Sequence, residues 1–415
     1  MKRILLTGLL LLGFPSLHGQ PGGEAIDFSK ARQLFERRQR GEALTDDERA
    51  YLERAAAERR KQQGNPPAAA GAVAADVDWE KARALYQRSQ RGDKLTPEED
   101  AYLKRAMMAA RRAGGGGGAR PANQRQAPER LTPLTDMTAG DRYEGEAGGL
   151  YGGGRNTPPD AHRQAAEAEL AKIRPLNAAG EPDERGVIGF VAISMSNATQ
   201  EFSRFKQVAD RSPLKSPQVV IVDCAQGGQA MAEWAPADAR PWAEARRRLA
   251  AAKVSPRQVQ TAWIKLANKG PTGSLQDHGR KLERDTLAVL HHARTQFPNL
   301  RIAYLGSRIY GGNATGGLNP EPYAYESAFA ARWLIQRQMQ GDAELAPAKA
   351  PLLLWGPYLW AEGTKGRKLD PLVWERADFG ADGVHPSDSG RQKVAERLLN
   401  FLTTDPLAKS WFVKP

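Results

Sequence analysis

The sequence of 415 residues has little of several residue types that carry stability or chemistry: one cysteine, six histidines and 7% aromatic residues. A single cysteine excludes an intramolecular disulfide, so packing must stabilise the fold. Cys224 ends the β-branched run VVIVDC, which favours a buried structural thiol over a reactive one. Because histidines are few, any histidine with a nearby acidic residue is a candidate catalytic base.

The start of the chain lacks an apolar run long enough to span a bilayer. Residues 4–14 are mostly apolar, follow a Lys-Arg pair and precede small residues, which is typical of a secretory signal peptide. No cysteine follows this stretch to accept a lipid. We predict that residues 1–19 are a signal peptide, that the mature protein begins near Gln20, and that it is secreted or periplasmic and not membrane-spanning.

The net charge of +12 at pH 7 makes nucleic acid the first anionic partner to consider. The basic residues are interleaved with acidic ones, as in FERRQRGEALTDDERAYLERAAAERR, instead of forming one basic block. Export also separates the protein from cytoplasmic nucleic acid. We therefore expect a solvated basic surface and no nucleic-acid partner, with adhesion to an anionic envelope or glycan as the alternative.

Two segments near the start repeat each other. Residues 27–55 and 78–106 align without gaps, and each pattern predicts a helix, a glycine break and a second helix. Thr and Glu three residues apart in each repeat, at 45 and 48 and at 96 and 99, have the spacing of a capping box. We predict helical hairpins at 20–63 and 78–112. Their small apolar faces make them a candidate surface for an unidentified partner, and a simple spacer is the alternative.

Residues 131–415 differ from the segments before them in their pattern of apolar and polar residues. Linkers rich in Gly, Ala and Pro are predicted at 64–77 and 113–130. After residue 131, apolar runs alternate with amphipathic helical stretches, which predicts an α/β fold: a five-stranded parallel sheet between two layers of helices. Catalytic groups in such sheets lie beyond the carboxyl ends of the strands. The predicted strands are GVIGFVAI, PQVVIVDC, QTAWIKLA, LRIAYLGS and PLLLWGP.

Polar groups follow the first three predicted strands. Ser194 and Ser196 lie at the turn after the first strand, Gly227 at the turn after the second, and Asn268 after the third. A hydroxyl, a backbone N–H and a carboxamide are what an acyl-transfer site needs as nucleophile and oxyanion donors. Taken singly, these residues are also typical of helix caps and turns. Their shared position after successive strands is the stronger signal.

The stretch ADFGADGVHPSDSG, near the end of the chain, supplies a candidate base. Asp382 and His385 are three residues apart, so the carboxylate can hold one ring nitrogen while the other takes a proton from a serine. An acidic helix start with an incidental histidine is the alternative. The other five histidines lack a comparable acidic partner.

These elements resemble the four sequence blocks of the SGNH, or GDSL-like, hydrolase superfamily, in the same order. The resemblance implies that Ser196 is the nucleophile. It also implies that Gly227 and Asn268 complete the oxyanion hole with the serine N–H, and that Asp382 and His385 complete a triad. It further implies the flavodoxin-like three-layer fold of that superfamily.

The resemblance covers most of residues 186–413 and has departures. The Gly-Asp that usually precedes the serine is Ser194-Met195 here, and the aspartate after the third-block asparagine is Lys269. Ser194 therefore remains an alternative nucleophile. The second block, CAQGGQAMAEW, is similar to that of carbohydrate O-acetyl esterases in the superfamily, which implies acylated sugars as substrates.

Aromatic residues follow several predicted strands, and flat rings suit both sugar faces and acyl chains. Trp355 and Tyr358 are predicted to bind substrate, together with Asn197 and Gly228 beside the nucleophile and the oxyanion glycine. Packing is the alternative for most aromatic residues in these segments, which also include Trp234, Tyr310, Tyr323, Tyr325 and Trp360.

The sequence as a whole predicts an exported serine esterase that hydrolyses an ester bond. The expected substrates are acylated small molecules or polysaccharides, and O-acetyl groups on carbohydrate are favoured. No metal or organic cofactor is implied. The alternative is a non-catalytic glycan-binding or envelope-associated protein that retains the SGNH fold, and the departures at Met195 and Lys269 motivate it.

Overall fold

The computed structural model describes residues 96–113 and 123–414, and scattered positions between 27 and 85. The predicted signal peptide at 1–19 and the predicted linker at 64–77 lie outside the described residues. The chain falls into two compact units, Met1–Ala110 and Arg111–Pro415.

Capping boxes occur in both repeats of the first unit. The backbone N–H of Thr96 donates to Glu99 (2.9 Å), and the N–H of Glu99 donates to the Thr96 hydroxyl (3.2 Å). Thr45 and Glu48 make the same pair of hydrogen bonds (2.9 and 3.3 Å). Reciprocal bonds of this kind satisfy donors at a helix start, and Thr96 directly precedes α5 (Pro97–Ala113).

A tyrosine contact is also repeated. The backbone N–H of Asp27 donates to the Tyr51 hydroxyl, and that of Asp78 donates to the Tyr102 hydroxyl, both at 2.9 Å and across 24 residues. Each tyrosine hydroxyl donates in turn to the carbonyl of the same aspartate. The two repeats therefore share local structure as well as sequence. Their hairpin boundaries remain a prediction.

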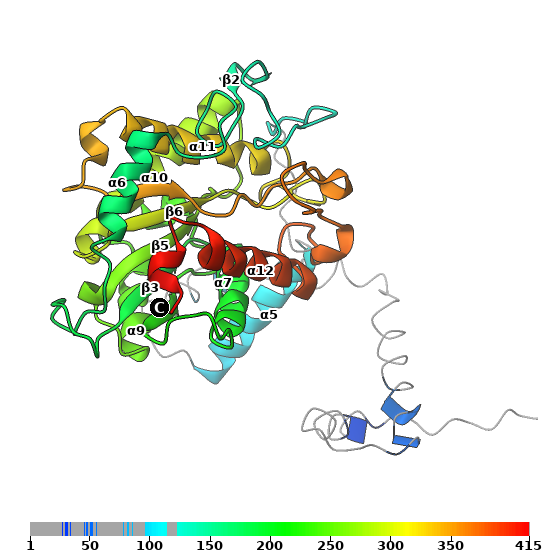
Figure 1. The fold of residues 1–415 in the computed structure, drawn as a ribbon. Helices are drawn as coiled ribbons and strands as arrows, with labels where there is room; N and C mark the ends of the chain where they lie inside the picture. The colour runs from blue at the N-terminus through cyan, green and yellow to red at the C-terminus, as the bar shows by residue number, and fades with distance from the viewer. Residues whose placement is uncertain are drawn as a thin grey trace, which may run out of the picture. The chain divides into compact units, whose positions relative to one another are not determined.

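The second unit is built on a five-stranded sheet in the order β4-β3-β5-β6-β7, and every pair of neighbouring strands is parallel (Figure 1). The strands are β3 (Ile188–Ile193), β4 (Val219–Asp223), β5 (Val259–Lys265), β6 (Ile302–Gly306) and β7 (Leu352–Trp355). Each one falls on a predicted apolar run. The α/β fold class is therefore confirmed.

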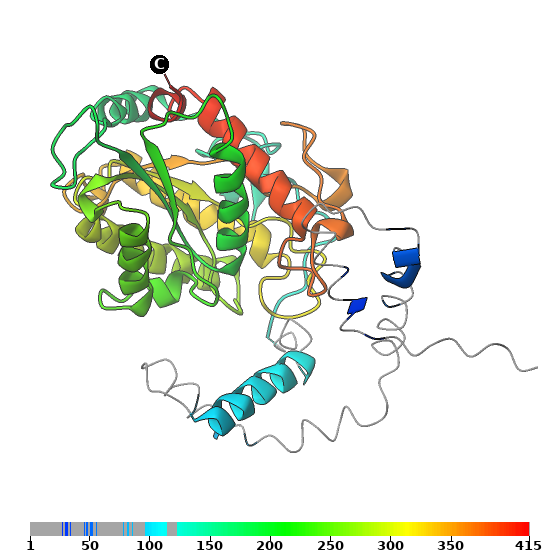
Figure 2. The same cartoon turned by 90° about the horizontal axis from the view of Figure 1, so that it is seen from below.

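Helices cover both faces of the sheet (Figure 2). Alternate residues of β3 face opposite layers: Phe190 packs in a cluster with α6, α7 and α12, and Val191 in a cluster with α9, α10 and α11. The helices are α6 (Asp160–Leu170), α7 (Ser196–Ala209), α8 (Met231–Trp234), α9 (Arg240–Ala251), α10 (Arg280–Gln296), α11 (Tyr323–Met339), α12 (Asp388–Thr404) and α13 (Lys409–Phe412).

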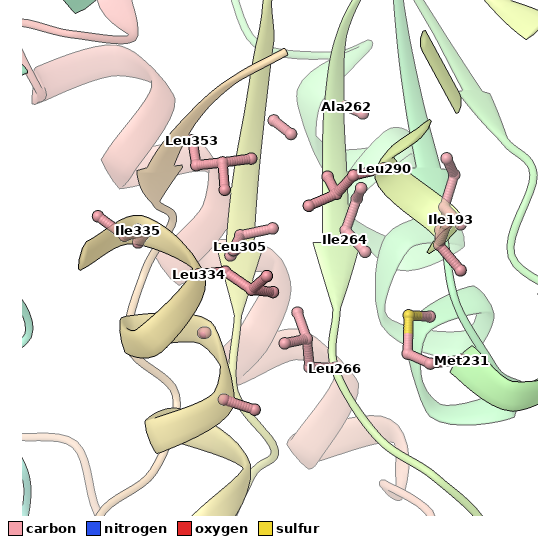
Figure 3. Packing of buried hydrophobic residues seen from close by; sticks show 14 of the residues in the cluster. Ile193, Met231, Ala262, Ile264, Leu266, Leu290, Leu305, Leu334, Ile335 and Leu353 are labelled. Atoms are coloured by element: carbon pink, nitrogen blue, oxygen red, sulfur yellow. The ribbon is translucent and has the colours of Figure 1, made fainter. Parts of the chain in front are cut away.

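The second of these clusters fills the space between the sheet and α10 and α11. Figure 3 shows Ile264 of β5 and Leu305 of β6 beside Leu290 of α10 and Leu334 of α11. Smaller elements complete the unit. Strand β1 (Arg142–Tyr143) pairs antiparallel with β2 (Glu146–Ala147), and short 3-10 or π turns occupy Pro256–Gln258, Leu275–Gly279, Ala343–Leu345, Gly363–Lys365 and Arg376–Asp378.

The segment just before residue 131 is bonded to the second unit. The buried Gln124 amide donates to the carbonyls of Pro271 and Gly317, both at 2.8 Å. The Arg125 guanidinium is paired with the fully buried carboxylate of Glu326, with one N–H···O contact of 2.6 Å. Residues 124 and 125 therefore belong to this unit, although the sequence places them in a linker.

We expect a chain that begins at residue 131 to be less stable than one that begins at residue 113. Without Arg125, Glu326 keeps only Tyr143 (2.6 Å) and His278 (2.5 Å) as side-chain partners. Removing one partner of a largely buried ion pair should lower the free energy of unfolding by about 2–3 kcal/mol. Urea unfolding of both chains measures the difference.

The matched single variants are Arg125→Ala and Arg130→Ala. Arg130 is exposed and lies 4.0 Å from Glu362, so its loss should change the free energy of unfolding by less than about 0.5 kcal/mol. Equal urea midpoints for the two single variants would show that the Arg125 contact contributes nothing to stability.

Candidate active site

Ser196 is the first residue of α7, which begins directly after the carboxyl end of β3. Its half-buried side chain places Oγ 2.7 Å from Nε2 of His385. Ser194 is fully buried and its hydroxyl donates to the carbonyl of Lys265, at the end of β5. Of the two candidate serines, Ser196 is thus the one whose hydroxyl meets the histidine.

Asp382 holds the other side of the His385 ring. Its Oδ2 lies 2.5 Å from Nδ1, and its Oδ1 accepts hydrogen bonds from the backbone N–H groups of Val384 and His385, both at 3.0 Å. Burial alone would raise the pKa of Asp382, but these hydrogen bonds lower it to about 2. The carboxylate is therefore ionised over the whole range in which a histidine titrates.

The loop that carries this pair is fixed by contacts from two sides. Asn197 of α7 is buried (1% exposed) and its amide donates to the carbonyl of Val384 (2.7 Å). Gly383 has φ +66°, and a Cβ there would lie 1.7 Å from the carbonyl oxygen of Asn313, so only glycine fits. Asn197 thus joins the serine helix to the histidine loop. Its role in binding substrate stays a prediction.

Helix α12 begins three residues after His385. The Ser387 side chain accepts from the N–H of Gly390 and caps the helix. Helices α7 and α12 lie side by side in both views (Figures 1 and 2). The helix that begins at Ser196 and the helix that follows His385 therefore pack against each other.

Gly227 and Gly228 are exposed in the loop after β4. The backbone N–H of Gln226 donates to the carbonyl of Ser194 (2.9 Å), which holds this loop against the turn that follows β3. A Cβ added at Gly227 would meet no atom within 4 Å, so the space over its backbone is open. Gly228 has φ +75°, which favours glycine.

Asn268 follows β5 and its side chain is held by two helices. Its amide Nδ2 donates to Asp285 of α10 (2.6 Å), and its Oδ1 accepts from the N–H of Ala232 in α8 (2.9 Å). One of the two amide hydrogens is therefore already bonded. Lys269 forms an ion pair with Glu233 of α8 (2.7 Å), so the departure from the family pattern at this position has a structural partner.

Trp355 and Tyr358, which are predicted to bind substrate, are buried. They are 4% and 3% exposed and belong to the core cluster on the α10 and α11 face. The Trp355 ring N–H donates to the carbonyl of Leu150 (2.7 Å), and the Tyr358 hydroxyl accepts from the N–H of Leu134 (3.2 Å). Both rings pack residues 131–150 onto the domain. The other four buried rings of the predicted aromatic group are Trp234, Tyr323, Tyr325 and Trp360.

Three buried charged residues near Ser196 were missed by the sequence analysis: Glu201, Lys265 and Arg308. Lys265 and Glu201 are both 0% exposed, and Lys265 Nζ lies 2.6 Å from each carboxylate oxygen. Burial lowers the pKa of Lys265 to about 8, against the opposing effect of Glu201. A lysine that ends an otherwise apolar strand was the available signal.

Other chemistries find less support in the described residues. Cys224 is buried as predicted, and burial raises the pKa of its thiol, which disfavours the reactive thiolate. Within the described ranges, no group of three or more His, Cys, Asp or Glu side chains is arranged to hold a metal ion. None of the described helices is long and apolar enough to cross a membrane.

Comparisons with known proteins found no matching protein-family model and no matching curated protein. Three similar solved structures are a presumed acylhydrolase from Bacteroides fragilis NCTC 9343, a presumed platelet activating factor from Streptococcus pneumonia, and the periplasmic domain of a lipopolysaccharide acetyltransferase from Salmonella ser. Paratyphi A. Their identities are 13%, 13% and 12%, and their TM-scores are 0.31, 0.27 and 0.29. The matches cover 60%, 58% and 59% of this chain and 100%, 90% and 97% of theirs. Values this low do not identify a family.

Proposed function

We propose that this protein is an exported serine esterase that removes O-acetyl groups from carbohydrate. The observation that carries the proposal is the chain of contacts from Ser196 Oγ to His385 Nε2 (2.7 Å) and from His385 Nδ1 to Asp382 (2.5 Å). A serine, a histidine and an ionised carboxylate in this order form the relay that activates a serine hydroxyl. Ser196 and His385 are 189 residues apart in the chain, yet their side chains meet.

In the first half of the reaction, Ser196 Oγ forms a bond to the ester carbonyl carbon while its proton passes to His385 Nε2. The π electrons of the carbonyl move to its oxygen. When this intermediate collapses, the bond to the alcohol oxygen breaks and that oxygen takes the proton from Nε2. An acyl group then remains on Ser196. Asp382 stabilises the imidazolium that exists between these steps.

The second half repeats these events with water. His385 takes a proton from water as the water oxygen bonds to the acyl carbon, and Ser196 leaves with that proton. The negative oxygen is stabilised by the backbone N–H groups of Ser196 and Gly227 and by the Asn268 amide. The N-terminus of α7, which is 14 residues long, adds the favourable end of its dipole.

The substrate assignment rests on the resemblance of the second block to carbohydrate O-acetyl esterases and on the open surface at Gly227 and Gly228. The buried positions of Trp355 and Tyr358 remove the stacking platform that the sequence suggested. We therefore expect recognition of the acetyl ester itself to dominate over stacking on the sugar ring. The resemblance of residues 1–19 to a signal peptide supports a substrate outside the cytoplasm.

The test is acetate release by the mature chain from acetylated xylan, beside a series of 4-nitrophenyl esters of rising acyl length. We expect acetate release from the glycan and the highest kcat/KM for acetyl among the aryl esters. Retained binding to xylan without hydrolysis of any ester would favour a glycan-binding protein instead. Hydrolysis that rises with acyl length would assign a lipase-like substrate and reject the carbohydrate ester.

A further inference from the structure

Arg308 lies two residues beyond β6, at the carboxyl edge of the sheet where Ser196 follows β3. Strand β5 separates β6 from β3 in the sheet. The Arg308 side chain nevertheless reaches the turn before Ser196, because its Nη1 lies 3.9 Å from the sulfur of Met195. The Arg308 side chain therefore extends from the end of β6 to the turn that precedes Ser196.

The surroundings of Met195 show on which side of Ser196 this contact lies. Met195 clusters with Ala230, which follows the Gly227 loop, and with Ala267, which precedes Asn268. These are the two loops assigned to the oxyanion hole. The Arg308 guanidinium thus approaches the site from the side on which negative charge develops in the proposed reaction.

The guanidinium is buried without an ion pair. Arg308 is 2% exposed, its Nε has no hydrogen-bond partner, and no carboxylate of the described chain pairs with it within 4.0 Å. Other buried cations of this domain are paired: Lys265 with Glu201 and Arg332 with Glu146, both at 2.6 Å. An unpaired buried charge costs several kcal/mol of stability, so its presence calls for a role outside folding.

Arg308 keeps its charge at neutral pH. Burial lowers its pKa to about 10, and the carboxylates of Glu201, Glu321 and Asp382 oppose that shift from a distance. These carboxylates belong to α7, to the segment before α11 and to the histidine loop, so the cation is surrounded by distant negative charge and touches none of it. Its Nη1 contacts the Met195 sulfur, and its Nε–H has no partner among the described residues, so that N–H is left for a ligand.

We propose that Arg308 is a further catalytic residue whose guanidinium stabilises the oxyanion formed on the Ser196 ester adduct. This inference rests on the proposed esterase function. In the resting enzyme, the Arg308 cation has no anionic partner. As the Oγ–carbon bond forms and the proton moves to His385, the carbonyl oxygen becomes negatively charged and supplies that partner. One of the two Asn268 amide hydrogens is already bonded to Asp285, so Asn268 can offer the oxyanion only the other. The Arg308 guanidinium would add a further, positively charged donor.

The test uses the mature chain and a neutral substrate, 4-nitrophenyl acetate, with Arg308→Gln and Arg308→Lys. We expect Arg308→Gln to lower kcat by about 100-fold or more, as for loss of one oxyanion donor. KM should change by less than about threefold, because the charge exists only in the transition state. Arg308→Lys should retain part of kcat. The melting temperature of Arg308→Gln should equal or exceed that of the wild type.

A second measurement separates catalysis from folding. Phenylboronic acid forms a tetrahedral anion on a catalytic serine, so its affinity should fall across the Arg308 variants in proportion to kcat. A kcat for Arg308→Gln within about threefold of wild type overturns the inference. So does a lowered melting temperature with unchanged boronate affinity, which assigns Arg308 a structural role. If Arg308→Gln fails to fold, Arg308→Lys provides the test. A boronate affinity and a kcat of Arg308→Lys equal to those of the wild type would overturn the inference. A wild type that hydrolyses no ester and binds no boronate rejects the esterase function itself.

Discussion

Replacing Ser196 with alanine is expected to lower kcat for acetyl ester hydrolysis by about three orders of magnitude or more, with the fold intact. The hydroxyl is the only group of the serine that meets His385, and no other described side-chain hydroxyl is bonded to the histidine ring. His385→Ala should cost a similar factor. The double variant should be no slower than either single one, because the two groups act as a unit.

Ser194→Ala is the matched control for this experiment. It removes the same hydroxyl two residues away, but that hydroxyl is buried and bonded to the carbonyl of Lys265. We expect kcat within about threefold of wild type and a loss of stability near 1 kcal/mol for the deleted hydrogen bond. An inactive Ser194→Ala beside an active Ser196→Ala would exchange the roles of the two serines.

Strand positions could be predicted from the sequence because buried parallel strands are continuous apolar runs. The run QTAWIKLA, for example, contains most of β5 (Val259–Lys265). The strand ends also place the residues that follow them at one edge of the sheet. Ser196 and His385 could be paired in this way, since a serine just after a strand and an Asp-x-x-His spacing are local patterns.

The sequence could not predict the direction in which a side chain points after a strand ends. Asn197 and Tyr358 come after strands and Trp355 ends one, yet all three are buried. Asn197 is turned toward Val384, and the two aromatic rings are covered by residues 131–150, a segment whose packing leaves no periodic signal. Position along a sheet edge follows from topology, but exposure at that edge depends on what covers it.

The buried charges Lys265 and Arg308 escaped the sequence analysis for a related reason. A charged residue at a strand end is exposed in most proteins, so a solvated side chain is the expected outcome. Buried Lys265 is paired with Glu201, 64 residues away in the chain, and buried Arg308 contacts Met195, 113 residues away. Neither contact produces a regular spacing of residues in the sequence, so neither could be predicted from it.

The Lys265–Glu201 pair gives the second large prediction. Both side chains are 0% exposed and joined by two contacts of 2.6 Å. Replacing Lys265 with methionine leaves the Glu201 carboxylate buried without its cation, and we expect the free energy of unfolding to fall by about 3–5 kcal/mol. Glu201→Met should cost about as much, because it strands the ammonium group instead. Urea unfolding with both single variants measures these losses.

The double variant, Glu201→Met with Lys265→Met, is the control that separates the pair from its volume. Two apolar side chains of similar size avoid the desolvation cost of both charges, so the double variant should recover most of the stability lost in either single one. If the double variant loses as much free energy of unfolding as the two single variants added together, the pair stabilises the fold by packing and not by charge.

The pair also has a consequence for the active site. Glu201 lies on α7, the helix that begins at Ser196, and Lys265 ends β5, whose last carbonyl accepts the Ser194 hydroxyl. The ion pair thus ties α7, the helix that begins at Ser196, to β5. We expect the double variant to fold but to lose kcat by about tenfold, since small displacements of a nucleophile are costly. A double variant with full stability and full kcat would show that the α7–β5 junction holds Ser196 in place without the ion pair.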